Sequence, residues 1–209
     1  EENLPFLREC LGDSAILGFG GRLTPTRVDG PDTKIIAGSI PAFPAYPPEF
    51  SWIREQQPDV PGISARKHPA GGKLVHLAAD IDRRYAACGL PDHGEVLAKL
   101  LDWAVEGDYP VTVQGPGSVD VQLYRQMDRW ILHIVNLTAA NQWPGYHEEV
   151  IPLGAQQIRL QSATFGGKPP STVRCTVREK GLNLQAESDG TLLCQLPELG
   201  LHEMLVFEL

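Results

Sequence analysis

The sequence predicts an α/β domain at residues 1–107, followed by an antiparallel β-sandwich at residues 108–209. Residues 71–106 combine a nearly continuous apolar run with a helical repeat of apolar residues, as in a parallel sheet covered by helices. After Gly107 the apolar residues recur at every second position, as in half-buried strands. Short runs of this kind, separated by turn residues, continue to the C-terminus and are typical of a sandwich.

The α/β domain is expected to contain two parallel strands and one long helix. The run "KLVHLAA" at residues 73–79 predicts one strand, and "SAILGFGG" predicts another near residues 15–19. The helix is expected to begin with Asp92 as its N-cap and Glu95 completing a capping box, and to end at Gly107. The apolar positions that recur at helical spacing are Val96, Leu97, Leu100, Leu101 and Ala104.

A proline-rich segment, "IPAFPAYPPEFSWI" at residues 40–53, lies between the two expected strands. Its prolines disfavour a helix or a central strand, so an extended and stiff loop is expected. The loop carries the aromatic residues Phe43, Tyr46, Phe50 and Trp52. The simplest interpretation is that these rings pack onto their own domain; a binding role, with Tyr46 and Trp52 as contacts, is the alternative.

The sandwich begins with a clear hairpin. "SVDVQLYRQ" at residues 118–126 alternates between apolar and polar residues, and a tight turn leads into "WILHIVNL" at residues 130–137. The second run is apolar on both faces, so a central strand is expected, with His133 as a satisfied core histidine. The further strand candidates are "EEVIPL", "QIRLQ", "STVRCTV", "LNLQA", "TLLCQL" and "EMLVFEL".

Composition argues against several partners and cofactors. The net charge of −8, with no cluster of Lys and Arg, disfavours nucleic acid and anionic membranes as partners. The longest apolar run is too short to span a bilayer. The four cysteines, Cys10, Cys88, Cys175 and Cys194, lack zinc-type spacing, and no metal or cofactor is expected. Free buried thiols are expected over a Cys175–Cys194 disulfide. The compartment stays undetermined, with the cytoplasm favoured.

Asp80 and Asp82 follow the strand at residues 73–79 and precede Arg83 and Arg84. A glycosidase needs two carboxyl groups on opposite sides of the scissile bond, and residues two apart on one loop approach from the same side. The arginines hold both carboxylates ionised, which favours ion pairs over a proton donor. A structural or interface role is therefore expected, although ligands also bind at this edge of parallel sheets.

Two further motifs are weaker. "HGE" at residues 93–95 matches the His-x-Glu of an amidotransferase triad, but neither Cys10 nor Cys88 lies on the sharp glycine-flanked turn that such a nucleophile needs. Asn136 begins a glycosylation sequon at the end of an apolar strand, where the motif has little weight.

The segment "GGKLVHLAADIDRRYAACGLPDHGEVLAKLLDWAV" resembles the end of the glutamine-amidotransferase-like, flavodoxin-like domain of large glycoside hydrolases. These include the family 42 β-galactosidases, in which it is called the trimerisation domain. The loop "IPAFPAYPPEFSWIR" is similar to a proline-aromatic loop of related glycoside hydrolases, and "VTVQGPGSVDVQLYRQMDRWILHIVNLT" to the start of their C-terminal sandwich. The resemblance covers roughly residues 10–140, and the remainder follows only the strand pattern.

The resemblance implies a partial flavodoxin-like domain without a working triad, and catalytic carboxylates on a preceding (β/α)8 barrel, so no catalytic residue is expected here. The implied tasks are oligomerisation and closure over the barrel, whose carbohydrate substrate belongs to the complete polypeptide. The implied contact residues are Tyr46, Trp52, Asp80, Asp82 and Arg83.

Two other functions stay open: a free-standing carbohydrate-binding module, and an amidotransferase-type enzyme that uses His93 and Glu95. The beginning of the chain reads as the cut end of something longer. With about two parallel strands before the helix, residues 1–107 are expected to need strands from a preceding segment, whereas residues 108–209 are expected to fold alone.

Overall fold

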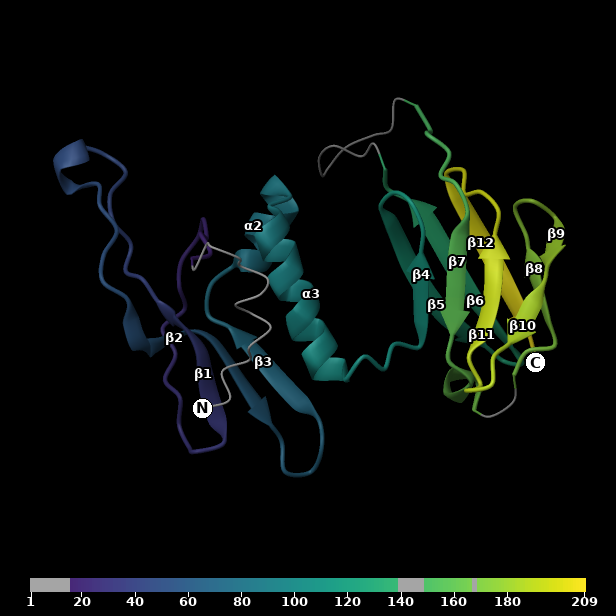
Figure 1. Ribbon diagram of the computed structural model, residues 1–209, viewed down its shortest axis with the longest axis horizontal. Helices are drawn as coiled ribbons and strands as arrows, with labels where there is room; N and C mark the ends of the chain where they lie inside the picture. The colour runs from purple at the N-terminus through teal and green to yellow at the C-terminus, as the bar shows by residue number, and fades with distance from the viewer. Residues whose placement is uncertain (1–15, 139–148, 167–168) are drawn as a thin grey trace. The chain divides into compact units, whose positions relative to one another are not determined.

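The computed structural model describes residues 16–138, 149–166 and 169–209. The chain divides into two compact units, residues 1–108 (unit 1) and residues 109–209 (unit 2). Within the described residues, strands dominate and the α-helices, α2 and α3, belong to unit 1 (Figure 1). Neither of these helices has the length and apolar character needed to cross a membrane.

Unit 1 contains an antiparallel sheet of three strands in the order β1–β2–β3. The strands are β1 (Thr33–Ser39), β2 (Gln57–Lys67) and β3 (Lys73–Leu77). The prediction of a parallel strand at residues 73–79 is therefore wrong, because β3 pairs antiparallel with β2. A short turn with Gly71 and Gly72 at positive φ joins the two strands, and so short a connection permits only antiparallel pairing.

The strand expected near residues 15–19 is also not found. Residues 16–21 form no strand, and Leu17 and Phe19 instead pack against the core of unit 1. An apolar run of this length does not by itself separate a strand from an extended segment that covers a core.

Strand β2 tolerates Pro58 and Pro61 although it lies in the middle of the sheet. Its pairing with β3 runs only from Ile63 to Lys67, so β2 has a neighbour on one side alone at the prolines. The pairing with β1 is also irregular there, where Gly38 lies opposite Pro61. The missing N–H groups therefore interrupt no regular ladder, and the prolines hid this strand from the sequence pattern.

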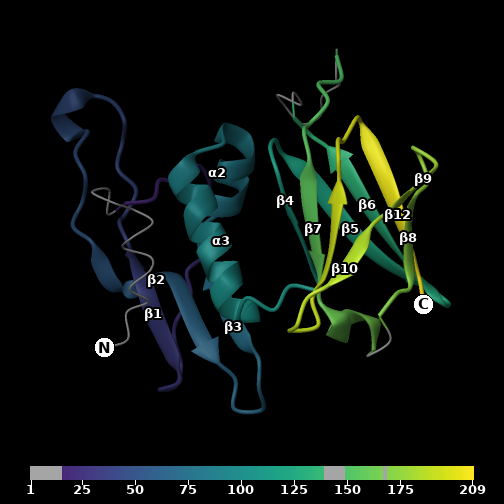
Figure 2. The ribbon, with the colours of Figure 1, turned by 45° about the vertical axis from the view of Figure 1, so that its right-hand side comes forward.

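The helices α2 (Ile81–Cys88) and α3 (Pro91–Val105) complete unit 1, and α3 lies alongside β3 in Figures 1 and 2. The predicted helix is confirmed, but its N-cap is Leu90 with no side-chain cap, so the capping box of Asp92 and Glu95 is not formed. Pro91 occupies the first helical turn, where its missing N–H has no intrahelical partner to lose.

The core of unit 1 lies between the helices and one face of the sheet. Its buried members are Ile63, Ile81, Val96 and Leu100. Leu101, which the sequence placed on the same apolar face, is 59% exposed.

Residues 40–56 form a long excursion between β1 and β2 that extends away from the sheet in Figure 1. The expected extended loop is interrupted by a short 3-10 turn, η1 (Pro48–Phe50). A proline at the first position of this turn explains why it is tolerated, since that N–H is not bonded within the turn.

Unit 2 is a sandwich of two antiparallel sheets. One has the order β10–β11–β7–β4 and the other the order β5–β6–β12–β8–β9. A 3-10 turn, η2 (Ser162–Phe165), follows β7. The strands are β4 (Val111–Gln114), β5 (Val119–Gln126), β6 (Arg129–Asn136), β7 (Gln156–Leu160), β8 (Thr172–Cys175), β9 (Lys180–Leu182), β10 (Leu184–Ala186), β11 (Leu192–Leu196) and β12 (His202–Glu208).

The predicted hairpin at residues 118–137 is confirmed. Strands β5 and β6 pair from Val119 opposite Asn136 to Gln126 opposite Arg129. Strand β6 is central, between β5 and β12, as its apolar pattern predicted. Leu132 and Ile134 point into the core shared by the two sheets and are fully buried.

Three details of unit 2 differ from the predictions. The run "EEVIPL" contributes only an isolated bridge between Leu153 and Leu199 among its described residues, and β4 was missed. His133 is not a core residue, since it lies on the outer face of β6 between the inward-pointing Leu132 and Ile134.

Candidate functional site

Asp80 and Asp82 lie where β3 leads into α2, and within the described residues Asp80 alone of the two forms an ion pair with an arginine. Asp80 precedes the first helical residue, and its Oδ2 pairs with Nη2 of Arg83 one turn later. The Asp80 side chain is 25% exposed, and that of Arg83 is 68% exposed. Asp82 is an exposed residue of the first turn. The two carboxylates therefore have different surroundings and do not form a pair.

The "GFGG" segment covers the Asp80–Arg83 ion pair. A Cβ at Gly21 would overlap the Asp80 carboxylate and lie 2.5 Å from Arg83 Nη2, so this position needs glycine. Asp80 Oδ1 is buried and has no hydrogen-bond partner among the described residues. A carboxylate held by a cation on one oxygen and enclosed by protein at the other suits a structural anchor better than a proton donor.

His93 holds the same segment from α3. The side chain is 4% exposed, and its Nε2 lies 2.6 Å from the carbonyl oxygen of Gly18, to which it donates. Within the described residues no hydrogen bond joins His93 to a cysteine or to Glu95, and Cys88 is exposed at the end of α2. The geometry of the described residues therefore supports a positioning role for His93 and offers no catalytic triad.

The proline-aromatic loop, residues 40–56, presents its rings to solvent. Tyr46 is 80% exposed, and Phe50 and Trp52 are 56% and 50% exposed. The Phe50 and Trp52 ring centres are 6.0 Å apart, and the Arg54 guanidinium lies 4.4 Å from the centre of the Trp52 ring. Of the five predicted contact residues, the structure thus brings Asp80 and Arg83 together. Tyr46 and Trp52 lie on a separate loop, and Asp82 is exposed in the first turn of α2, where it forms no ion pair or hydrogen bond with the other four among the described residues.

An open pocket of about 360 Å³ lies in unit 1 between the β2–β3 turn and the end of α3. Lys73 Nζ donates to the Trp103 carbonyl oxygen at 2.8 Å and pairs with Glu106 Oε1 at 2.7 Å. This hydrogen bond from Lys73 holds the pKa of Glu106 below its ordinary value of 4.5. Because Lys73 Nζ already binds a backbone carbonyl and a carboxylate of the protein, a structural role is favoured for Lys73.

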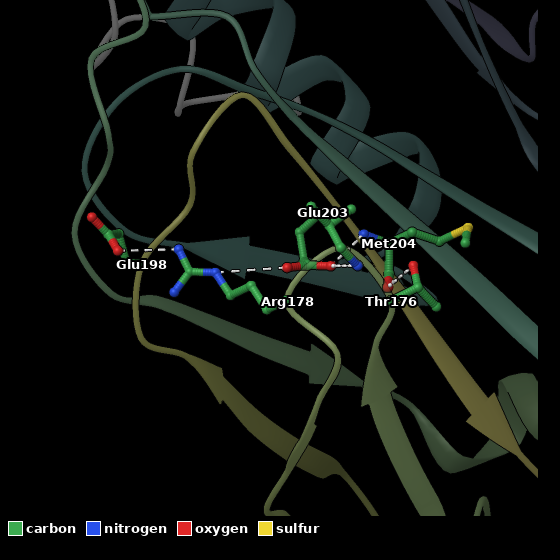
Figure 3. A network of polar contacts seen from close by, with 6 residues as sticks. Thr176, Arg178, Glu198, Glu203 and Met204 are labelled. Atoms are coloured by element: carbon green, nitrogen blue, oxygen red, sulfur yellow. Dashed lines mark hydrogen bonds and ion pairs between the residues drawn. The ribbon is translucent and has the colours of Figure 1, made fainter.

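A buried carboxylate organises one end of the sandwich. Glu203 Oε1 accepts hydrogen bonds of 3.0 Å from the backbone N–H groups of Val177 and Met204. Figure 3 shows Arg178 between the two glutamates, with Nε 3.7 Å from Glu203 Oε2 and Nη2 3.2 Å from Glu198 Oε2. This network joins the end of β8 to β12 and is structural.

The thiols of unit 2 are free and buried, as the sequence predicted. Burial, followed by the charge of Glu203, raises the pKa of Cys175 to about 11, and burial raises the pKa of Cys194 to about 12. Neither is a reactive nucleophile. Cys88 is free as well, and Cys10 lies outside the described residues. The described residues contain no cluster of three His, Cys, Asp or Glu side chains that suits a metal ion.

One group of side chains was missed in the sequence. Tyr124 of β5, His133 of β6 and His202 of β12 come together on the outer face of the five-stranded sheet. Tyr124 was visible on the polar face of its alternating strand, but His202 comes from a strand 69 residues after His133. Only the pairing of β6 with β12 brings the two histidines together.

No family model matches the sequence. A search of curated proteins also finds no match. Among solved structures, α-L-fucosidase isoenzyme 2 from Paenibacillus thiaminolyticus is similar over 75% of this chain and 23% of its own, with 19% sequence identity and a TM-score of 0.54. Gan42B, a GH42 β-galactosidase from G. stearothermophilus, matches over 72% of this chain and 16% of its own. Its sequence identity is 11%, and two structures, one of a catalytic mutant, give TM-scores of 0.36 and 0.37.

The similarity to the fucosidase concerns the fold, and it transfers no residue role at this identity. The chain spans 23% or less of the length of these three solved chains. Its fold is therefore related to part of a glycoside hydrolase.

Proposed function

We propose that this chain is a non-catalytic part of a glycoside hydrolase, which serves oligomerisation and closure over a (β/α)8 catalytic barrel on a preceding segment of the same polypeptide. The observation that carries the proposal is the fold shared with the α-L-fucosidase. That match covers 75% of the chain, which is more than either unit alone contains, so it includes residues of both units.

The proline-aromatic loop is the proposed contact with the barrel or with a neighbouring subunit. Its exposed rings include Tyr46 and Trp52, and aromatic side chains are enriched in the cores of protein interfaces. Prolines restrict the free loop, so ordering it on a partner loses less conformational entropy than ordering a flexible loop would.

The Asp80–Arg83 pair supports the same role from the start of α2. The pair fixes the first turn of the helix, and it leaves Asp82 and most of Arg83 exposed for a contact. In this proposal Asp80 positions the turn, whereas Arg83 and Asp82 meet the partner.

We also propose that unit 1 is part of a flavodoxin-like domain, and the free edge of β3 supports this. Among the described residues, no strand pairs with the edge of β3 that faces away from β2. Leu74 on this strand is 57% exposed. An unpaired edge is a template for further strands, so parallel strands from a preceding segment have a place to join the sheet there.

Hydrogen exchange tests the proposal by comparing this chain alone with the complete polypeptide. We expect slower exchange at residues 40–53 and along β3 when the preceding segment is present. Replacing Tyr46 and Trp52 together by alanine should weaken assembly, whereas Met127→Ala, which removes a 90% exposed side chain from unit 2, should not. Unchanged exchange at both segments, or hydrolysis of aryl glycosides by this chain alone, contradicts the proposal.

A further inference from the structure

A polar strip crosses the outer face of the five-stranded sheet in unit 2. It consists of Asp120, Gln122 and Tyr124 on β5, His133 on β6 and His202 on β12, and we call it the His–Tyr strip. The strands β5, β6 and β12 are neighbours, and Gln122 lies directly opposite His133. Leu132 and Ile134 flank His133 and enter the core, so the strip lies on the face away from the core.

The two histidines hold each other in a fixed orientation. Their rings are nearly parallel, with centres 5.3 Å apart and an interplanar angle of 13°, and they meet edge to edge, since His133 Nδ1 lies 3.0 Å from His202 Nε2. The edge of one ring meets the face of another between Tyr124 and His133, with centres 5.7 Å apart. Since each ring restricts its neighbour, binding a ligand here loses little side-chain entropy.

The free nitrogens of this pair have a defined hydrogen-bonding character. His133 Nε2 and His202 Nδ1 have no hydrogen-bond partner among the described residues and are not buried. When both rings are neutral, the shared bond needs one donor and one acceptor. Whichever histidine donates, one of the two free nitrogens carries a hydrogen and the other accepts one. The pair therefore presents one donor and one acceptor together, and hydroxyl groups can satisfy both.

A relay of two hydrogen bonds fixes the β5 side of the strip. The Tyr124 hydroxyl donates to Gln122 Oε1, and Gln122 Nε2 donates to Asp120 Oδ2 at 2.9 Å. The Tyr124 side chain remains 51% exposed. This relay orients an aromatic ring and leaves the lone pairs of the Tyr124 hydroxyl and the Asp120 carboxylate as acceptors.

We propose that the His–Tyr strip binds a neutral sugar, with a pyranose ring against Tyr124 and its hydroxyl groups bonded to His133, His202 and Asp120. An oriented aromatic surface beside a few fixed polar groups is the usual composition of a small-molecule site. The site lies entirely in unit 2, so it does not depend on the role proposed for unit 1.

Charge and composition select this occupant. Asp120 and the net charge of −8 disfavour phosphate, sulfate or an acidic sugar. Arg129, at the hairpin end of the same face, already donates from Nε to Gln126 Oε1 at 2.8 Å. Val135 and Met204 lie directly opposite His202 and His133 on the same face. The hydrogen-bonded imidazoles beside them are fixed polar groups, which the hydroxyl groups of a sugar satisfy and the apolar centre of a protein interface does not.

An NMR titration of the 209-residue chain with cellobiose, lactose and maltose tests the proposal. Each sugar is added to about 20 mM, which nearly saturates a site with a Kd of about 1 mM. We expect saturable shifts at residues of β5, β6 and β12 with at least one sugar. Tyr124→Ala should weaken that binding at least tenfold. His202→Phe keeps an aromatic ring but removes the free nitrogen and the bond to His133, and it should weaken binding as well.

Gln185→Ala is the matched control, because Gln185 is exposed on β10 in the opposite sheet. It should leave the affinity unchanged, whereas Gln122→Ala, which breaks the Tyr124 relay, should lower it. If Tyr124→Ala does not fold, His202→Phe and Gln122→Ala decide the question. Absence of saturable shifts with all three sugars overturns the proposal. So do shifts confined to residues 40–53, affinities that survive these variants, or line broadening of the strip that depends on protein concentration and shows self-association.

Discussion

Unit 1 and unit 2 bury their apolar residues in different ways. In unit 2 the core lies between two sheets, and side chains such as Leu132, Ile134 and Phe207 are fully buried. In unit 1 a single three-stranded sheet is covered on one face by two helices, and its buried cluster is smaller. A sheet needs a covering layer on each apolar face, so the described part of unit 1 has one layer fewer than a doubly wound domain.

Several large apolar side chains of unit 1 are exposed, which agrees with its smaller buried cluster. Leu74 of β3 and Leu101 of α3 are 57% and 59% exposed, and the rings of the proline-aromatic loop add to them. Neighbouring exposed rings, such as those of Phe50 and Trp52, are typical of regions that contact a partner. The difference between the units is that unit 2 encloses its own core between two sheets, whereas the described part of unit 1 leaves several large apolar side chains exposed.

The largest expected effect comes from separating the two units. Residues 109–209 should unfold in one cooperative thermal transition, because the sandwich encloses its own core. Residues 1–108 should aggregate or bind a hydrophobic dye without a cooperative transition, because one face and one edge of their sheet are open. Calorimetry and dye binding on the two fragments measure this. A monomeric and cooperative fragment 1–108 would remove the proposed dependence of unit 1 on a partner.

The next largest expected effect is on the unfolding free energy, when a hydrogen-bonded polar side chain is replaced in each unit. Asn136 of unit 2 is 2% exposed; its Nδ2 donates to the Ile151 and Gly200 carbonyls at 2.8 and 3.1 Å, and its Oδ1 accepts from Thr138 N. Asn136→Ala leaves these backbone groups without partners and should cost about 2–4 kcal/mol of unfolding free energy. These bonds also make Asn136 unsuitable as a glycan acceptor.

In unit 1 the comparable anchor is Asp80. Because the Arg83 side chain is 68% exposed, Asp80→Asn should cost only about 1 kcal/mol or less. Asp82→Asn is the control and should change stability by about 0.5 kcal/mol at most, since Asp82 is exposed. Urea denaturation of the complete chain gives all three values. A larger loss for Asp80→Asn than for Asn136→Ala would reverse the comparison between the units.

The two units also differ in how far their sequence determines the fold. The alternation of residues 118–126 and the doubly apolar run at residues 130–137 predict β5 and β6 with the correct pairing, because side-chain period and turn are local features. In unit 1 the continuous apolar run of β3 suggested a parallel strand, while Pro58 and Pro61 concealed the antiparallel partner β2. Apolar runs report burial; they do not report the direction of the neighbouring strand.

Among the site residues, contacts between sequence neighbours could be predicted, whereas contacts between distant residues could not. Asp80 and Arg83 are one helical turn apart, so their ion pair was within reach of the sequence. The bond from His93 to the Gly18 carbonyl and the bond between His133 and His202 join residues 75 and 69 positions apart. Such contacts exist only after the elements have packed, and no local pattern encodes them.

The smallest expected effect concerns two exposed carboxylates. The pKa of Glu106 in unit 1 is lowered chiefly by the hydrogen bond and the charge of Lys73. The pKa of Asp189 in unit 2 is lowered chiefly by the backbone N–H of Thr191, which donates to Asp189 Oδ1 at 2.9 Å. Each lowered pKa stabilises the folded state above the ordinary pKa of the group, and this contribution is lost as the pH falls through the lowered value.

Salt should affect the ion pair that lowers the pKa of Glu106 more than the backbone hydrogen bond that lowers the pKa of Asp189. Mobile ions screen the attraction between exposed charges, so 1 M NaCl, where the screening length is about 3 Å, should move the pKa of Glu106 toward its ordinary value of 4.5. The neutral N–H group of Thr191 is screened far less, so the pKa of Asp189 should move less. Lys73→Met should produce the same shift at Glu106 without salt and leave Asp189 unchanged. NMR titration of the two side-chain carboxyl carbons in the three conditions measures all six pKa values. Equal movement of both pKa values with salt would mean that the general field of an acidic protein, and not these two local partners, sets them.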